Sequence, residues 1–133
     1  MTFDIINPES LGVPRGWNHA LVGPAGGRVL FVAGQTAVAR DGRIPASSFV
    51  EQWEQALTNV LTVVRRAGGT PEDIGRFTIY VTDLDAYRDG RKAIGVVYRR
   101  LMGRHYPAMA LVEVKRLVDE GAQIEIEATA VLP

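Results

Sequence analysis

The sequence predicts one α+β domain in which two helices cover a single face of a β-sheet. The chain has 133 residues, of which 47% are hydrophobic and 23% charged, the balance of a soluble globular domain. Residues 122–131 alternate apolar and polar side chains with the period of a strand, whereas residues 50–64 repeat apolar side chains with the period of a helix. We therefore expect both kinds of element around one core.

The first part of the chain is expected to be β-structure. Residues 2–6 predict a short strand that ends at the turn-forming Asn7-Pro8 pair. Residues 17–22 predict a second strand, and the Gly- and Pro-rich residues 23–27 predict a turn after it. Residues 28–33 are almost continuously apolar, so we expect them to form the other arm of a β-hairpin.

The middle of the chain predicts a helix and then a strand. Ser48 followed by Glu51 matches a capping box, which indicates a helix start directly before the apolar repeat of residues 50–64. Gly68-Gly69 is expected to end this helix, and Thr70-Pro71 to open one further turn. Residues 77–81 alternate as a half-buried strand does.

A second helix is expected over residues 84–103, with Asp83 as its N-cap, followed by strands over residues 105–114 and 122–131. The last strand directs Glu125, Glu127 and Thr129 to one face. We expect Met109, Leu111 and Glu113 to share this face. Two helices can cover only one face of the sheet, so this second face is left uncovered. A mixed apolar and acidic face is poorly suited to water, so we predict a closed homo-oligomer with sites between subunits.

Composition excludes several classes of function. Lys and Arg number 15 and so do Asp and Glu, so no net charge favours nucleic acid or an anionic membrane. The absence of cysteine fits a cytoplasmic protein, and no apolar run is long enough to span a membrane. The glycines match no nucleotide-binding loop, and the two histidines lack metal-binding spacing. We therefore expect neither a cofactor nor a metal site.

Several segments together resemble the Rid (YjgF/YER057c/UK114) family along nearly the whole chain. The resemblance is carried by Asn7-Pro8, residues 16–20 (Gly-Trp-Asn-His-Ala), residues 31–35 (Phe-Val-Ala-Gly-Gln), Gln52, Asn59-Val60, residues 81–84 (Val-Thr-Asp-Leu), Pro107-Ala108 and residues 124–128 (Ile-Glu-Ile-Glu-Ala). It implies a chorismate-mutase-like α+β fold with a mixed sheet. It also implies a homotrimer with three pockets between neighbouring subunits.

The resemblance further implies hydrolysis of reactive enamines or imines to a carbonyl product and ammonia. Family members hold the substrate carboxylate with an arginine after the Pro-Ala pair, but this position is Met109 here, and a thioether cannot bind an anion. The glutamate that handles protons corresponds to Glu125, and the aromatic wall to Trp17. The pocket is expected to include Trp17, His19, Ala33, Gly34, Arg91, Met109 and Leu111.

Each of these residues also has a purely structural interpretation. Glu125 is either a proton-transfer group or an interface residue in a salt bridge. Arg91 lies on the apolar stripe of the second predicted helix, where it either extends its stem over the core edge or returns a cation to the pocket. His19 shares a strand face with Trp17, so it is either hydrogen-bonded within an interface or orients a ligand.

Arg88, Lys92 and Arg99 form a basic stripe on the second predicted helix. Because some family members are labelled endoribonucleases, the stripe raises an RNA-cleaving alternative. Asp85 and Asp89 dilute the charge and no aromatic side chains interleave with it, which favours a solvated helix face. The leading hypothesis is therefore an enamine or imine deaminase, and the alternative is a small-molecule-binding or regulatory trimer without catalysis.

Overall fold

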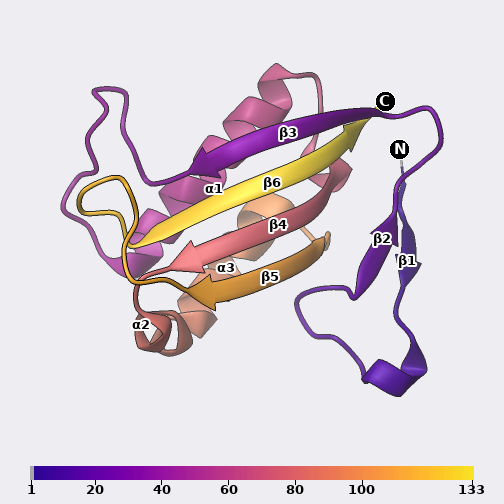
Figure 1. Cartoon of the computed structure of the whole chain (residues 1–133), viewed down its shortest axis with the longest axis horizontal. Coiled ribbons are helices and arrows are strands. Elements are labelled where there is room, and N and C mark those ends of the chain that lie inside the picture. The colour runs from indigo at the N-terminus through magenta and orange to yellow at the C-terminus, as the bar shows by residue number, and fades with distance from the viewer. Residues whose placement is uncertain (1) are drawn as a thin grey trace.

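A computed structural model describes residues 2–133 of the chain (Figure 1). Its elements, in chain order, are β1 (Asp4–Ile6), the 3-10 turn η1 (Glu9–Leu11), β2 (Ala20–Val22), β3 (Arg28–Gln35), α1 (Phe49–Arg66), the 3-10 turn η2 (Pro71–Asp73), β4 (Ile74–Val81), α2 (Leu84–Asp89), α3 (Arg91–Met102), β5 (Ala108–Glu113) and β6 (Ile124–Leu132). None of the helices described is long and apolar enough to cross a lipid bilayer.

The main sheet has the strand order β3-β6-β4-β5. The β4–β5 pair is parallel, and the β3–β6 and β4–β6 pairs are antiparallel, so the sheet is mixed. Figure 1 shows the helices behind this sheet, with the opposite face of all four strands uncovered. The predicted α+β architecture with helices on one face is confirmed.

The start of α1 follows the predicted capping box. Ser48 accepts a hydrogen bond from the backbone N–H of Glu51, and the Glu51 carboxylate accepts one from the backbone N–H of Ser48. The buried stripe of this helix faces the strands, where Leu57, Val60 and Leu61 are almost completely excluded from solvent. Apolar burial of this kind is the main stabilising term of the fold.

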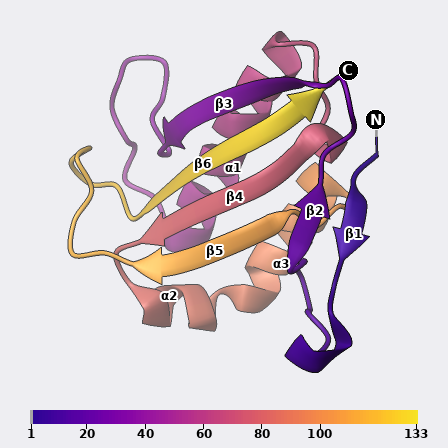
Figure 2. The ribbon, with the colours of Figure 1, turned by 45° about the vertical axis from the view of Figure 1, so that its right-hand side comes forward.

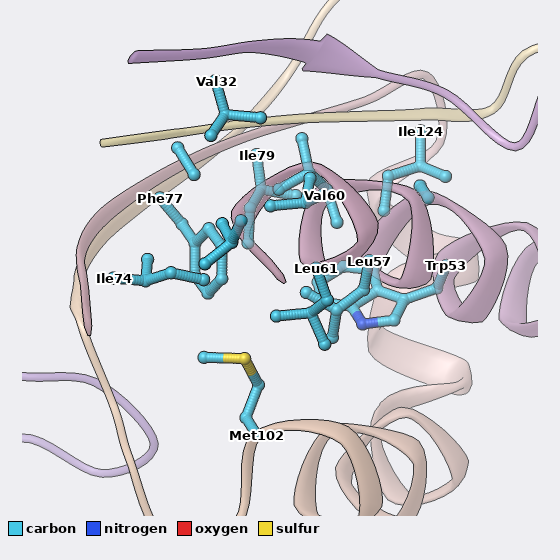
Figure 3. Packing of buried hydrophobic residues seen from close by; sticks show 14 of the residues in the cluster. Val32, Trp53, Leu57, Val60, Leu61, Ile74, Phe77, Ile79, Met102 and Ile124 are labelled. Atoms are coloured by element: carbon cyan, nitrogen blue, oxygen red, sulfur yellow. The ribbon is translucent and has the colours of Figure 1, made fainter. Parts of the chain in front are cut away.

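The core fills the space between α1, α3 and the covered sheet face (Figure 3). Alternate residues of β4 and β6 supply its sheet side, as the period-two patterns of both strands predict; they are Ile74, Phe77, Ile79, Val81, Ile124, Ile126, Ala128, Ala130 and Leu132. The other residues of β6, Glu125 and Glu127 among them, lie on the uncovered face. We call this surface, formed by β3, β6, β4 and β5 away from the helices, the open face.

The predicted hairpin between residues 17–22 and 28–33 is wrong. β2 pairs with β1 in a separate two-stranded sheet, whereas β3 pairs with β6 (Figure 2). The Gly- and Pro-rich turn between β2 and β3 sends the chain from one sheet to the other rather than back on itself. Trp17 and His19 precede β2 and belong to no strand.

The single helix predicted over residues 84–103 is also divided. Asp83 caps the start as expected, by accepting a hydrogen bond from the backbone N–H of Ala86 at 3.0 Å. The helix then breaks at Gly90 into α2 and α3. A Cβ at position 90 would lie 3.1 Å from Val50 of α1 and from the Ala86 carbonyl oxygen, so glycine permits this close packing.

Candidate functional site

Glu125 lies on the open face, near the start of β6. The register pairs Glu125 with Tyr80 and Glu127 with Thr78, which places all four side chains on the same surface. The Tyr80 hydroxyl donates a hydrogen bond to Glu127 Oε1 at 3.1 Å, and this bond raises the pKa of Tyr80. Glu125 therefore belongs to a small polar group on the open face.

A β-bulge in β3 lies next to Glu125. Regular pairing of β3 with β6 is interrupted between Val32 and Gln35, at Ala33 and Gly34. A Cβ at position 34 would lie 2.8 Å from Cδ and from Oε1 of Glu125, so the missing side chain of Gly34 provides the space for this carboxyl group. β-Bulges often aim side chains at functional sites, and here the bulge positions a carboxyl group.

The pKa of the Glu125 carboxyl is raised above its ordinary value. Desolvation by burial is the main cause, and the negative charges of Asp119 and Glu127 add to it. No ion pair involving Glu125 occurs among the residues that the structure describes. A raised pKa makes a carboxyl group better able both to accept and to return a proton, as a general acid/base requires.

A second feature, which we call the aromatic cavity, lies on the helix side of the sheet beside β5. It has a volume of about 460 Å³, within the range of small-ligand sites. Its walls come from the segments before β2 and before β5, from α1, α2 and α3, and from β4 and β5. The lining residues are Arg15, Gly16, Trp17, Trp53, Ile79, Tyr87, Arg91, Ile94, Gly95, Tyr98, Tyr106, Met109 and Leu111.

Aromatic contacts order these walls. Trp53 packs against Tyr87 with 5.6 Å between ring centroids, and Tyr98 stacks on Tyr106 at 5.2 Å. The Arg91 guanidinium lies 5.8 Å from the centroid of the Tyr87 ring, in the geometry of a cation–π contact. The cavity is thus rich in aromatic side chains, with two cationic side chains among its lining residues.

Hydrogen bonds from two asparagines hold the Arg15–Trp17 segment in place. The Asn18 side chain donates to the Tyr106 carbonyl oxygen at 2.6 Å and accepts from the Asn7 side chain at 2.8 Å. Asn18 also forms an isolated bridge with Ala108 at the start of β5. These bonds fix the segment next to the strand that carries Met109.

The predicted site residues fall into two groups on opposite sides of the sheet. Trp17, Arg91, Met109 and Leu111 line the aromatic cavity. Glu125 and Gly34 meet on the open face, beside Ala33 in the same bulge. One chain therefore does not bring the proposed acid/base to the proposed binding residues.

The expectation that Met109, Leu111 and Glu113 share a face with Glu125 is wrong. The parallel register pairs Met109 with Phe77 and Leu111 with Ile79, which are buried residues of the helix-covered face. Glu113 follows them on that face, and its carboxylate accepts a hydrogen bond from the backbone N–H of Leu84 at 3.0 Å. A register between distant strands cannot be derived from the alternation within each of them.

His19 lies beside the aromatic cavity but does not line it. Its ring meets Trp17 edge-on at 4.6 Å between centroids, and its Nε2 lies 3.4 Å from the Gly12 carbonyl oxygen. Among residues 2–133 there is also no group of three or more histidine, aspartate or glutamate side chains that could hold a metal ion.

Sequence reasoning missed Arg15 and Tyr106 as cavity residues. Both lie in irregular segments, where no periodicity assigns a side chain to a face. Their proximity to residues already singled out was the available signal, because Arg15 is two residues before Trp17 and Tyr106 is three before Met109.

The fold and the two groups of residues define a small α+β domain of the kind that known relatives share. A model of the family described as Endoribonuclease L-PSP matches residues 10–132. The chain is 38% identical over 103 residues to the RutC family protein y4sK of Sinorhizobium fredii. The aligned region covers 77% of this chain and 78% of that protein.

The chain is also 35% identical over 109 residues to TdcF of Escherichia coli K12, provisionally named a reactive intermediate deaminase, over 79% of this chain and 80% of TdcF. Among solved structures, YyfB of Yersinia pestis, described as a Rid protein of unknown function, superposes with a TM-score of 0.85 and 33% identity over 99% of this chain and 100% of YyfB. The chain belongs to the Rid (YjgF/YER057c/UK114) family.

Proposed function

We propose that the protein is a Rid-type deaminase that hydrolyses an enamine or imine to a carbonyl compound and ammonia. The observation that carries the proposal is the position of Glu125, whose carboxyl group is seated over the Gly34 bulge and has a raised pKa. The similarity to TdcF supports the reaction class at the level of the family.

In the proposed reaction, water attacks the C=N carbon while the Glu125 carboxylate accepts one of its protons. The C–O bond forms as the C=N π pair moves to nitrogen, which takes the proton from Glu125 and gives a carbinolamine. The Glu125 carboxylate then accepts the hydroxyl proton of this intermediate and passes it to nitrogen, so that the C=O bond forms, the C–N bond breaks and ammonia leaves. An enamine would first be protonated on carbon to give the imine.

We further propose that the site is completed in a homotrimer. Glu125 and the aromatic cavity lie on opposite faces of one sheet, so a substrate in the cavity would meet Glu125 only from a neighbouring subunit. Two apolar side chains of β3 support burial of the open face, because Phe31 is 80% exposed and Val29 is 56% exposed in the single chain.

The direct test of the proposed activity is the release of 2-keto acids from imino acids generated in situ by an amino-acid oxidase. We expect the protein to accelerate this release. The Glu125→Gln variant keeps the size of the side chain, and we expect its rate of release to be at least tenfold lower. No acceleration with aliphatic, aromatic or acidic substrates would overturn the proposal.

A second candidate is a ligand-binding or regulatory trimer without catalysis. Met109 at the position of the family arginine favours it, since a thioether cannot anchor a carboxylate. In that case Glu125→Gln would leave ligand binding intact and there would be no turnover to lose. RNA cleavage would instead depend on Arg88, Lys92 and Arg99, which are exposed on α2 and α3 and do not line the cavity.

A further inference from the structure

Two cationic side chains, Arg15 and Arg91, line the aromatic cavity. Among the residues that the structure describes, no Asp or Glu lines it. Within residues 2–133 neither guanidinium forms an ion pair. The Arg91 guanidinium lies over the Tyr87 ring, and among residues 2–133 it donates no hydrogen bond, so the paired N–H donors at the edge of its planar group are available to an anion.

A buried donor on the cavity wall also has no partner. In the described part of the chain the indole N–H of Trp53 has no hydrogen-bond partner, although the residue is only 4% exposed. Figure 3 shows its nitrogen turned away from the strands. By contrast, the hydroxyl of Tyr98 is already used, because it donates to the His105 carbonyl oxygen at 2.7 Å. A buried donor without a partner is costly, so an acceptor that reached the indole N–H on ligand binding would be stabilised.

The remaining walls suit a flat ring. Trp17, Tyr87 and Tyr106 contribute aromatic surface, and Met109 adds a polarisable thioether that packs well against rings. Gly95 of α3 leaves open space, since a Cβ built there meets no atom within 4 Å. A volume of about 460 Å³ accommodates a phenyl or indolyl group together with a carboxylate.

From these observations we infer that the cavity binds an aromatic carboxylate, with its ring against the aromatic walls and its anion on Arg15 and Arg91. Resting on the proposed function, this names the substrate class: a 2-imino acid with an aryl side chain, which water converts to the 2-keto acid and ammonia. Arg15 and Arg91 then replace the arginine whose position is occupied by Met109.

Binding is tested without turnover, by isothermal titration of the protein with phenylpropanoate. We expect phenylpropanoate to bind at least tenfold more tightly than phenylpropanamide, which lacks the charge, and than propanoate, which lacks the ring. The sequence has two tryptophans, Trp17 and Trp53, and both line the cavity. Intrinsic fluorescence therefore reports occupancy of this site directly.

Variants locate the site. Arg15→Gln and Arg91→Gln are each expected to weaken phenylpropanoate binding at least fivefold and to leave the amide unaffected. Arg88 is an exposed cation of α2 outside the cavity. The matched control Arg88→Gln should therefore change the affinity for neither phenylpropanoate nor phenylpropanamide. Gly95→Leu fills the cavity and should abolish phenylpropanoate binding, whereas Gly95→Ala should preserve it. We expect both variants to fold, because a Cβ at position 95 meets no neighbouring atom.

The two proposals fail separately. Equal affinity for phenylpropanoate and propanoate, or binding that survives Gly95→Leu, would overturn the assigned ligand class while imine hydrolysis of small substrates could still be observed. Tight phenylpropanoate binding that depends on both arginines, without any imine hydrolysis, would keep the ligand class and overturn the deaminase.

Discussion

The backbone of Gly34 lies against the carboxyl group of Glu125, so closely that a Cβ at position 34 would come within 2.8 Å of Oε1. The two residues belong to neighbouring strands, and the bulge between Val32 and Gln35 brings them together. The conformation of the proposed acid/base group therefore depends on the absence of a side chain at Gly34.

Gly34→Ala is expected to lower the rate of imine hydrolysis about tenfold without unfolding the protein, because the methyl group displaces a flexible carboxyl group. The measurement is kcat, together with a thermal melt to confirm folding. In the Glu125→Gln background the same change should have little further effect, since the two residues act as a unit. Additive losses would show that Gly34 acts independently of Glu125.

The Glu125→Gln variant is expected to be more stable than the parent at neutral pH. The folded-state pKa of Glu125 is raised above 4.5, so the native state binds more protons than the unfolded state and its stability falls as pH rises through that raised pKa. The advantage of Gln should shrink as pH falls and vanish below about 4.5. Urea unfolding of both proteins from neutral pH to below about 4.5 measures this difference in stability. A difference that does not change with pH would contradict the raised pKa of Glu125.

Gly95→Ala is expected to stabilise the fold by roughly 0.5–1 kcal/mol, because glycine inside a helix carries an entropic cost and the new methyl group meets no neighbour. Gly68→Ala is the matched control. Gly68 has φ +92°, a conformation that alanine adopts only with strain, so this variant should lose stability. Chemical unfolding of both variants provides the comparison, and destabilisation by Gly95→Ala would mean that α3 packs more tightly than described.

Phe31→Lys is expected to dissociate the proposed trimer, because it places a charge on the apolar part of the open face. Sedimentation velocity gives the mass of the assembly directly. Val118→Lys is the control, since Val118 is 99% exposed but lies in the segment between β5 and β6, outside the sheet. A parent protein that sediments as a monomer would refute the trimer itself.

Local patterns predicted the elements well, and contacts between distant segments poorly. Ser48 and Glu51 determine the start of α1 through bonds between neighbours in sequence, and the alternation of β6 correctly placed Glu125 opposite to Ile124 and Ile126. Family resemblance correctly indicated the mixed sheet. These features depend on residues a few positions apart or on patterns of the whole family.

The errors concern pairings that sequence spacing does not determine. Met109 alternates as any strand residue does, and only its parallel register with Phe77 assigns it to the helix-covered face. Likewise β2 pairs with β1 in spite of the turn that follows it, and the break at Gly90 reflects close packing against Val50. Arg15 reaches the aromatic cavity through hydrogen bonds of Asn18 to a segment far along the chain.

The strand order has a consequence for how the protein is made. β6 is the last strand in sequence, yet it lies between β3 and β4 and pairs with both. During synthesis, β3 and β4 therefore have no partner between them until residues 124–132 have left the ribosome, and the backbone N–H and C=O groups along the edges that later pair with β6 remain unpaired. We expect the main sheet to form in one cooperative step after β6 has been translated. The contact between Glu125 and Gly34 then forms in that same step.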